Sequence, residues 1–249
     1  MESIKETIAR HERIALQLSG GRDSIACLFY LRPYLEHITV YTLNTGAMFP
    51  ETRETLEQLR PMIPHYVEIQ GNQPFTVEHF GYPSDLVPVS HTPFAHLSDQ
   101  PPSYLLQSRY DCCARVIMAP MHQRMIDDGI TLIIRGQRAI DRHKSPIKSG
   151  ETVDGIEFLY PINEWSDVDV MAYLAEVRAP IPRFYEYLSM APDCMTCSAW
   201  WDERRAAYLA EFHPEAFETY QTRLDFIRQA TQPHIEQFNG ELIVRSNDT

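Results

Sequence analysis

The stretch Ile14-Ala15-Leu16-Gln17-Leu18-Ser19-Gly20-Gly21-Arg22-Asp23-Ser24 decides the fold. It joins an apolar run typical of a buried strand to a glycine turn, and residues 25–31 after it predict a helix. Glycines let a backbone approach an anion closely, and a helix N-terminus presents unpaired N–H groups and a partial positive charge. Taken alone, the stretch predicts either a phosphate-binding turn or a plain strand-to-helix turn between the first strand and the helix that follows.

Strand and helix signals alternate through the first 70 residues. β-Branched and aromatic side chains at 38–43 and 67–69 predict two further strands. Between them Pro50 and Glu51 suit a first helical turn, so we expect a helix from Pro50 to about residue 60. Strands that alternate with helices predict an α/β fold with an open, mostly parallel twisted sheet flanked by helices.

Residues 71–108 are rich in proline, histidine and serine, which predicts a segment without long regular elements: a lid, a binding loop or a disordered loop. After this segment we expect a helix over 112–127 that bends at Pro120. Residues 131–135 predict a buried strand, and 136–150 predict a basic loop.

The last third of the sequence predicts mainly helices. One covers 167–177, with Ser166 as its N-cap and Asp169 as a capping-box partner. Another covers 200–229 and breaks near Pro214, and 241–244 predict a short strand. We expect an α/β domain over 1–190, with 71–108 inserted in it, and a helical C-terminal region over 191–249.

Composition narrows the class of protein. Hydrophobic residues make up 44% of the 249, which is ample for a core, and no apolar stretch approaches the roughly 20 residues of a membrane span. Residues 1–13 are charged and polar, unlike a secretory signal, so we expect a cytoplasmic protein with no membrane partner. The formal net charge of -12 disfavours a broad nucleic-acid surface, although a local basic patch lies at 135–148.

Two further segments follow strand ends, where open α/β sheets bind ligands. They are Leu43-Asn44-Thr45-Gly46-Ala47-Met48-Phe49-Pro50-Glu51-Thr52 and Arg135-Gly136-Gln137-Arg138-Ala139-Ile140-Asp141-Arg142. The second is either a solvated basic loop or a phosphate site. Arg138 is the first candidate to bind phosphate, because a planar guanidinium can pair two oxygens. Its candidate helpers are Arg142, His143 and Lys144.

Four of the five cysteines form two close pairs, Cys112-Cys113 and Cys194-Met195-Thr196-Cys197. Four thiolates can hold an iron–sulfur cluster or a tetrahedral zinc ion, and unligated thiols are the third alternative. Adjacent cysteines strain the coordination of one small ion, which favours the cluster. Cys27 falls in the first predicted helix, where a buried core position is the better interpretation.

These motifs, and their order along the chain, resemble those of the phosphoadenosine-phosphosulfate (PAPS) reductase-like family. This family is a branch of the PP-loop ATP pyrophosphatases, in the adenine nucleotide α-hydrolase superfamily. The loop is similar to that family's S-G-G-x-D-S, and the later segments to its D-T-G-x-x-F-P-E-T and G-x-R. The cysteine pattern is similar to that of adenylyl-sulfate reductases, which hold one [4Fe-4S] cluster. Residues 159–170 are similar to a family segment that opens a helix, for which we expect packing and capping only. The resemblance implies a Rossmann-like sheet.

The resemblance also implies ligands and site residues. It implies an adenine nucleotide, ATP with Mg²⁺, and a [4Fe-4S] cluster held by Cys112, Cys113, Cys194 and Cys197. Asp23 and Arg138 are implied as catalytic residues, while Asn44 replaces the family's usual aspartate and lacks its charge. The implied nucleotide-binding residues are Ser19, Gly20, Gly21, Arg22, Asp23, Ser24, Asn44, Thr45, Gly46, Gly136, Arg138 and Arg142.

Two departures from the resemblance bear on the reaction. The sulfonucleotide reductases carry a nucleophilic cysteine in a late segment like E-C-G-L-H, whereas the last cysteine here is Cys197. They have usually lost the Gly-Gly-x-Asp-Ser loop, which this chain keeps. We therefore expect an enzyme that cleaves ATP between the α and β phosphates, adenylates an acceptor and releases pyrophosphate, in sulfur transfer or in modification of a nucleic acid or small molecule.

Two alternatives stay open. One is a PAPS or adenylyl sulfate reductase that uses a partner's thiol, and the other is a non-catalytic nucleotide-binding subunit of a complex. The expected partners are an unknown acceptor, a sulfur donor or partner protein, and a second copy in a homodimer.

Overall fold

The structure is a computed structural model that describes residues 4–97, 104–141, 144–190, 192–201 and 204–246. The chain divides into two compact units. The first, the sheet unit, comprises 1–71 and 119–186, and the second, the cysteine unit, comprises 72–118 and 187–249. A domain boundary at residue 190 stays a prediction, because these units group 72–118 with the C-terminal part of the chain.

The described part of the sheet unit contains a six-stranded sheet in the order β3-β2-β1-β6-β8-β7. Neighbouring strands are parallel except for the edge pair of β7 and β8. Ile14 is in register with Ile38 on one side and with Leu132 on the other. The strands are β1 Ile14–Gln17, β2 Ile38–Asn44, β3 His65–Gln70, β6 Leu132–Ile134, β7 Thr152–Val153 and β8 Ile156–Leu159.

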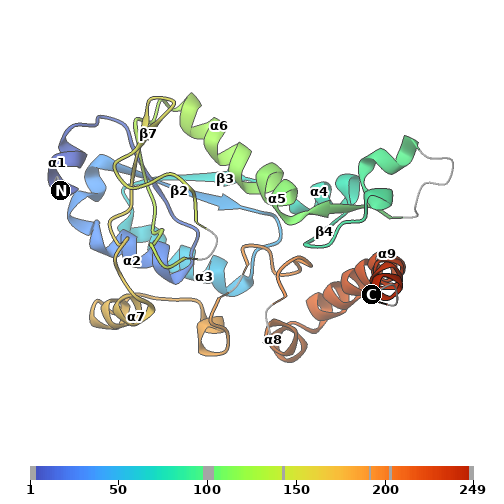
Figure 1. Cartoon of the computed structure of the whole chain (residues 1–249). Coiled ribbons are helices and arrows are strands. Elements are labelled where there is room, and N and C mark those ends of the chain that lie inside the picture. The colour runs from blue at the N-terminus through green and yellow to red at the C-terminus, as the bar shows by residue number, and fades with distance from the viewer. Residues whose placement is uncertain (1–3, 98–103, 142–143, 191, 202–203, 247–249) are drawn as a thin grey trace. The chain divides into compact units, whose positions relative to one another are not determined.

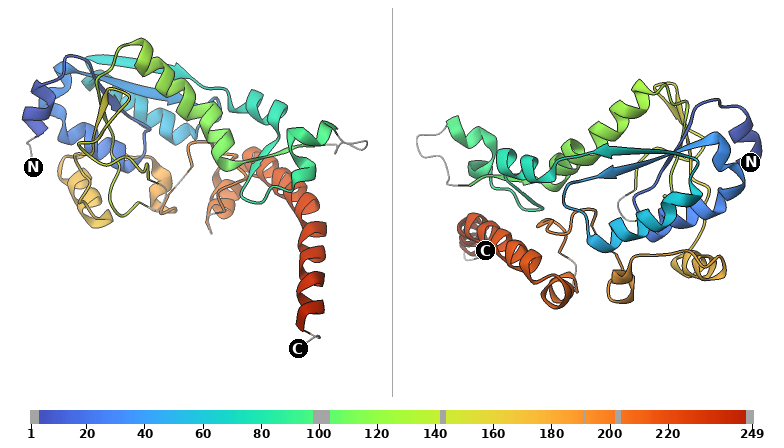
Figure 2. Two further views of the ribbon diagram at one scale, coloured as in Figure 1. Left: turned by 45° about the horizontal axis from the view of Figure 1, so that its top comes forward. Right: turned by 180° about the vertical axis from the view of Figure 1, so that it is seen from behind.

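Helices cover both faces of this sheet. Figures 1 and 2 show α2 and α3 on one face and α6 on the other. The core holds fully buried aliphatic residues of β1 and α2 such as Leu16, Ile25 and Leu28, as expected for a strand buried on both faces. The helices and 3₁₀ turns are α1 Ile4–Ala9, α2 Arg22–Tyr30, η1 Arg32–His37, α3 Pro50–Leu59, η2 Arg60–Met62, α6 Ala119–Asp127, α7 Asp167–Glu176 and η6 Arg183–Glu186.

The cysteine unit is mainly helical around one short parallel pair of strands, β4 and β5. Its small core joins Leu106 of β5 to Ile227 and Ala230 of the long C-terminal helix. Its elements are α4 Gln73–Phe80, β4 Tyr82–Ser84, η3 Val89–His91, η4 Pro93–Leu97, β5 Leu106–Ser108, α5 Arg109–Cys113, the π-helical turn η5 Ala114–Met118, α8 Arg205–Phe212 and α9 Pro214–Ser246.

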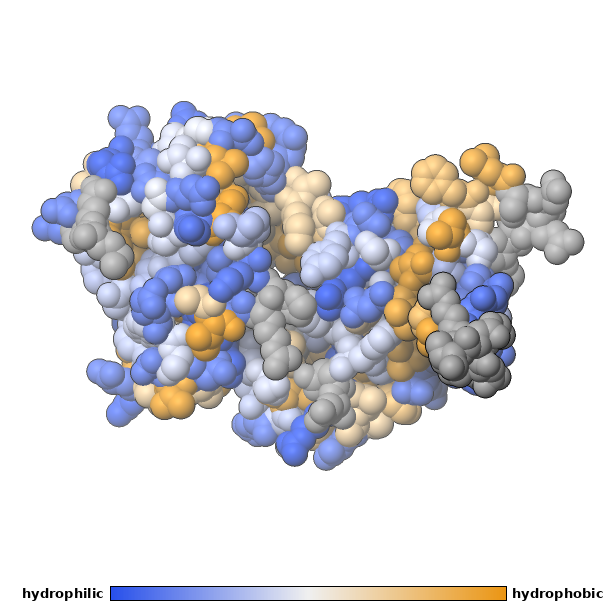
Figure 3. Space-filling view, viewed as in Figure 1, coloured by the Kyte–Doolittle hydropathy of each residue, from blue (hydrophilic) through white to orange (hydrophobic). Residues whose placement is uncertain are grey.

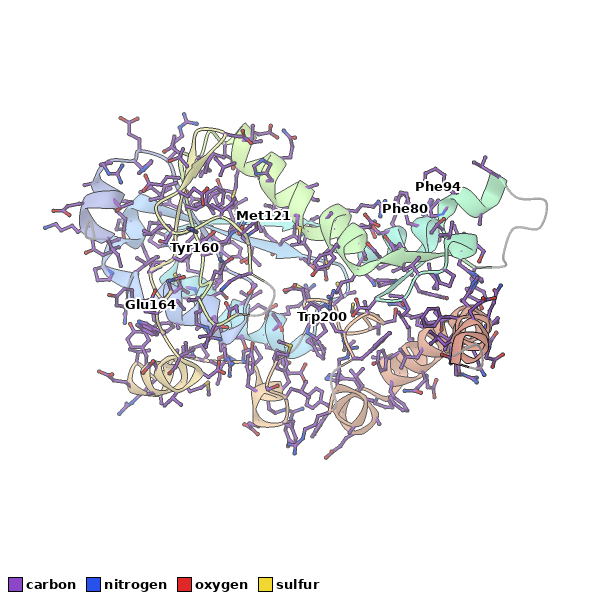
Figure 4. All side chains as sticks on the ribbon, in the orientation of Figure 1. Phe80, Phe94, Met121, Tyr160, Glu164 and Trp200 are labelled. Carbon is purple, nitrogen blue, oxygen red and sulfur yellow. The ribbon has the colours of Figure 1, made fainter. Side chains whose placement is uncertain are left out.

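Apolar side chains gather on the outside of the cysteine unit at η3 and η4. Val89, Phe94 and Leu97 are each at least three-quarters exposed. Figure 3 shows this surface in orange, and Figure 4 labels Phe94 on it. Among the described helices, none carries an apolar stretch of the length that crossing a bilayer requires.

The predicted fold class is confirmed, and each predicted strand and helix is present except the strand at 241–244. The sequence did not predict α1, β7 or β8, nor α4, β4 and β5 within the segment expected to be a loop. The strand predicted at 241–244 is wrong, because these residues continue α9, where Glu-Leu-Ile-Val follows a helix without any break signal. Strand β8 was not predicted, because four residues after a glycine turn give too short a signal. The prolines of residues 71–108 do not exclude a helix, because Pro74 lies in the first turn of α4, where a proline is tolerated.

Candidate nucleotide-phosphate site and cysteine pocket

The predicted phosphate loop lies at the point where the strand order of the sheet reverses. The chain passes from β1 to β2 and β3 on one side, and returns through β6 on the other. The carboxyl ends of β1 and β6 meet there, which is where open α/β sheets bind ligands. The Ser19–Ser24 loop follows β1 and the Gly136–Arg138 segment follows β6, so the topology brings two predicted motifs together.

Two glycines allow the close backbone approach at this point. Gly20 has φ +82, and a Cβ there would lie 2.7 Å from Thr52 Cγ2. A Cβ on Gly136 would lie 2.5 Å from the carbonyl oxygen of Asp23. The Gly136 backbone therefore packs directly on the phosphate loop, and larger residues at either position force a neighbour to move.

The loop orders its own polar groups before any anion binds. The Ser24 hydroxyl donates to the Gly21 carbonyl at 2.8 Å, and the Gly21 amide donates to Ser19 Oγ at 3.3 Å. Gly21 is the N-cap of α2, so the first amides of this helix face the turn. The Arg22 amide, the first of the helix, donates to the Tyr185 hydroxyl at 3.2 Å.

Arg138 is buried in the centre of a charged cluster, at 4% exposure. Its Nη1 donates to Asp167 Oδ1 at 2.9 Å, and its Nη2 lies 3.2 Å from Asp141 Oδ1. Asp167 Oδ1 also accepts from Arg22 Nη2 at 2.5 Å. Burial alone would lower the pKa of Arg138, but Asp23 and the other two carboxylates raise it, so the guanidinium stays charged.

Asp23 is the unsatisfied member of this cluster. Its Oδ1 is buried and lies 3.2 Å from Arg138 Nε, yet neither atom has a hydrogen-bond partner in the described residues. Burial raises the pKa of Asp23 above its ordinary value, although Arg138 and Arg22 oppose this. An acceptor oxygen that lies between cations without a hydrogen bond is available to another ligand.

The second predicted motif forms the turn after β2. Asn44 Oδ1 accepts from the Gly46 amide at 3.0 Å, and Thr45 Oγ1 accepts from the Ala47 amide at 3.2 Å. Gly46 has φ +76, which explains the glycine. The Asn44 side chain thus shapes this turn, a role that needs no negative charge.

Three residues of the phosphate site were missed by the sequence analysis: Asp141, Asp167 and Tyr185. The segment with Asp167 was expected to pack and cap only. The Ser166–Asp169 capping box is confirmed, and it places Asp167 in the first turn of α7, facing the two arginines. Arg142 and His143 lie outside the described residues, and Lys144 donates to the Ala139 carbonyl.

All four paired cysteines line one pocket in the cysteine unit. Gln73, Arg109 and Trp200 line it as well, and Figure 4 labels Trp200. The Arg109 guanidinium lies 4.2 Å from the centre of the Trp200 ring. Burial raises the pKa of the Cys112 and Cys113 thiols to about 12. Without a ligand these thiols are therefore neutral at pH 7.

Two arginines supply positive charge beside these cysteines. Arg205 is fully buried, and its Nε and Nη1 have no hydrogen-bond partner in the described residues. Its guanidinium lies 4.6 Å from the Tyr220 ring centre. Arg223 donates to the Thr196 carbonyl at 2.7 Å, inside the Cys194–Cys197 turn. A fully buried and a half-buried cation beside the cysteines favour an anionic occupant of the pocket.

The cysteine geometry does not match a single-ion site. Among the described residues, no three His, Cys, Asp or Glu side chains converge closely enough to hold one metal ion. Convergence on a point is what tetrahedral zinc requires, with each sulfur about 2.3 Å from the metal. In a cubane each thiolate binds a different iron, so four thiols around one pocket need not converge.

Comparison with known proteins identifies the family. Residues 13–199 match the phosphoadenosine phosphosulfate reductase domain. The chain belongs to this family. An adenosine 5'-phosphosulfate reductase from Neisseria meningitidis is 23% identical over 186 residues, 68% of this chain and 70% of that protein. One from Allochromatium vinosum is 20% identical over 199 residues, 80% of this chain and 73% of that protein.

A solved structure shows the PAPS reductase fold directly. The phosphoadenylyl-sulfate (PAPS) reductase from Candida auris, in complex with phosphate, is 15% identical with a TM-score of 0.54, over 76% of this chain and 85% of that chain. The predicted superfamily is thereby confirmed together with the fold. The assignment of individual site residues stays a prediction.

Proposed function

We propose that this PAPS reductase family protein binds ATP, cleaves the bond between the α and β phosphates, and transfers the adenylyl group to an acceptor. The acceptor oxygen forms a new bond to the α-phosphorus, and pyrophosphate leaves with the former bridging oxygen. The observation that carries the proposal is the complete Ser19–Ser24 loop at the reversal of the sheet, with Arg22 and Arg138 beside it.

The residues of the loop suit a phosphate chain. The first amides of α2 would donate to phosphate oxygens. The Ser19 and Ser24 hydroxyls, which donate to Ser24 Oγ and the Gly21 carbonyl, would do so after turning toward the anion. Arg22 and Arg138 share one carboxylate oxygen of Asp167, which is about 60% exposed at its side chain and can be exchanged for a phosphate oxygen. Two guanidiniums aimed at one oxygen would stabilise the charge that builds on departing pyrophosphate.

Mg²⁺ fits the charge of this cluster. Three carboxylates, from Asp23, Asp141 and Asp167, surround two guanidiniums, and the buried Asp23 Oδ1 has no hydrogen-bond partner in the described residues. A hard cation is bound by one or two carboxylates together with substrate phosphates. Asp23 is the residue that would hold the ion, which would supply neutralisation of the phosphate charge.

A [4Fe-4S] cluster fits the cysteine pocket. Cys112, Cys113, Cys194 and Cys197 would hold it, and the buried Arg205 and the half-buried Arg223 would balance the thiolate charge. Such a cluster supplies either sulfur and electron chemistry or structural support. Ligands that must stay reduced suit a cytoplasmic location, which we include in the proposal.

The second candidate is a reductase of adenylyl sulfate or PAPS. The two adenosine 5'-phosphosulfate reductases among the relatives favour it. That reaction needs a thiol to attack the sulfate sulfur, and Cys27, the cysteine outside the pocket, is fully buried in α2. The thiol would then come from a sulfur donor or partner protein. A non-catalytic role in a complex, and a homodimer, remain further alternatives to test.

One parallel assay separates the two reactions. Anaerobically purified protein is given α-labelled ATP with Mg²⁺ and either total tRNA, duplex DNA or a small-molecule extract as acceptor. Pyrophosphate release together with label on the acceptor supports the proposal. Sulfite release from adenylyl sulfate or PAPS with thioredoxin or glutathione, and no pyrophosphate from ATP, contradicts it.

A further inference from the structure

The Tyr185 hydroxyl lies on the phosphate loop at the start of α2. The hydroxyl oxygen accepts a hydrogen bond from the Arg22 amide at 3.2 Å. A Cβ on Gly21 would lie 3.2 Å from the same oxygen. The Arg22 guanidinium lies 5.7 Å from the centre of the Tyr185 ring. The hydroxyl of Tyr185 therefore contacts the backbone at Gly21 and Arg22, and its ring lies near the Arg22 side chain.

Packing fixes Tyr185 in this place. Its neighbour Phe184 is buried, with its ring centre 5.2 Å from that of Phe49, which belongs to the turn after β2. Arg183, which precedes Phe184, places its Nη2 3.9 Å from Oε1 of Glu51 in the first turn of α3. The η6 turn is thus packed against the segment after β2, through Phe49 and Glu51. This packing places Tyr185 next to the Ser19–Ser24 loop.

The position of the hydroxyl marks a phosphate-oxygen subsite. The first amide of a helix has no partner within the helix, and it is the group that an anion's oxygen accepts from. A hydroxyl oxygen that accepts from this amide takes the place of such an oxygen. We infer that the Tyr185 hydroxyl occupies the subsite of a phosphate oxygen. It must therefore leave the Arg22 amide when a phosphate chain binds. This inference rests on the proposed function, because it assumes that the ligand of the loop is a phosphate chain.

Removing the hydroxyl tests this inference. Tyr185→Phe keeps the ring over Arg22 and removes the competing oxygen, so pyrophosphate should bind about three- to tenfold more tightly, the effect of one ordinary hydrogen bond. The matched control is Tyr187→Phe, two residues away, where the ring packs on Tyr208 and Phe212. This control should bind pyrophosphate as the native protein does.

The measurement is isothermal titration of the full chain with magnesium pyrophosphate, together with the chemical shift of the Arg22 amide. Tighter binding by Y185F alone, with an Arg22 amide that shifts on titration in the native protein, supports the inference. Equal or weaker binding by Y185F at an unchanged melting temperature overturns it. No binding by all three proteins overturns both the inference and the proposed function. Tighter binding by Y185F alongside sulfite release from adenylyl sulfate overturns the proposed function only.

Discussion

At the scale of single residues, Arg138 lies at the centre of the candidate phosphate site. It is buried, and it lies within ion-pair distance of Asp23, Asp141 and Asp167, which come from three different segments. Because each of its three guanidinium nitrogens faces a different carboxylate, a flexible ammonium cannot replace it fully. The site is therefore sensitive to the shape of this cation as well as to its charge.

Substituting Arg138 should separate charge from shape. We expect R138K to keep most of the stability but to slow pyrophosphate release by about tenfold to a hundredfold, because the bidentate contact is lost. R138M should also lower the free energy of unfolding by about 2 kcal/mol, since carboxylates are left without their cation. Urea denaturation and a pyrophosphate assay check the pair. Equal activity of R138M and the native protein would show that Arg138 does not act on the phosphates.

Asp23 gives a pH-dependent prediction. Its pKa is raised in the folded state, so the carboxyl favours folding below its unfolded pKa, and this contribution is lost as pH rises through the folded pKa. D23N should therefore gain stability relative to the native protein as pH rises from about 3 to 7. Denaturation midpoints at several pH values measure this. A native-to-D23N difference that stays constant with pH would contradict the raised pKa.

At the scale of elements, the close packing of two backbones positions the site. The segment after β6 touches the phosphate loop at Gly136, where a Cβ has no room. The capping box at Ser166 then sets the start of α7 so that Asp167 reaches both arginines. The geometry of the charged cluster thus depends on a glycine and a helix cap as much as on the charged residues.

Gly136→Ala should disturb fold and site together. The added methyl group would clash with the Asp23 carbonyl, costing about 1–3 kcal/mol and weakening ATP binding. The control is Gly240→Ala in α9, where a Cβ meets nothing within 4 Å and alanine favours the helix by about 0.5–1 kcal/mol. Thermal unfolding and ATP titration of both variants check this. A fully stable G136A that binds ATP normally would contradict the packing argument.

The elements were more predictable than the contacts between them. Strand and helix signals up to residue 70 are local, so they predicted β1, α2, β2, α3 and β3. The roles of Asp167 and Tyr185 depend on chain segments about 145 and 163 residues from Arg22, and no local pattern encodes such a contact. The paired cysteines were found from spacing, but their ligand could not be, because spacing alone fits a cluster, zinc or free thiols.

At the scale of the whole molecule, the two candidate sites lie in different units of the chain. The sheet unit carries the candidate phosphate site, and the cysteine unit carries the four-thiol pocket. Family membership covers residues 13–199, and so includes both. Each unit can accordingly be tested by variants that leave the other unit's residues unchanged.

The cysteine pocket predicts a definite metal content. Anaerobically purified protein should contain about four iron and four sulfide per chain, the composition of one [4Fe-4S] cluster. Iron and sulfide analysis measures this. C112S and C197S should lose most of this iron, whereas C27A should retain it, because Cys27 is a core residue of α2. Stoichiometric zinc without sulfide, or native iron content in C197S, would contradict the cluster.

The most direct test of the account is the nucleotide preference of the phosphate site, measured by titration of the anaerobic full chain with ATP, AMP, adenylyl sulfate and PAPS in the presence of Mg²⁺. The loop amides and the two arginines should favour magnesium ATP by at least about tenfold over adenylyl sulfate and AMP, since β and γ phosphates add charge-assisted hydrogen bonds. Tighter binding of adenylyl sulfate or PAPS than of ATP would contradict the account.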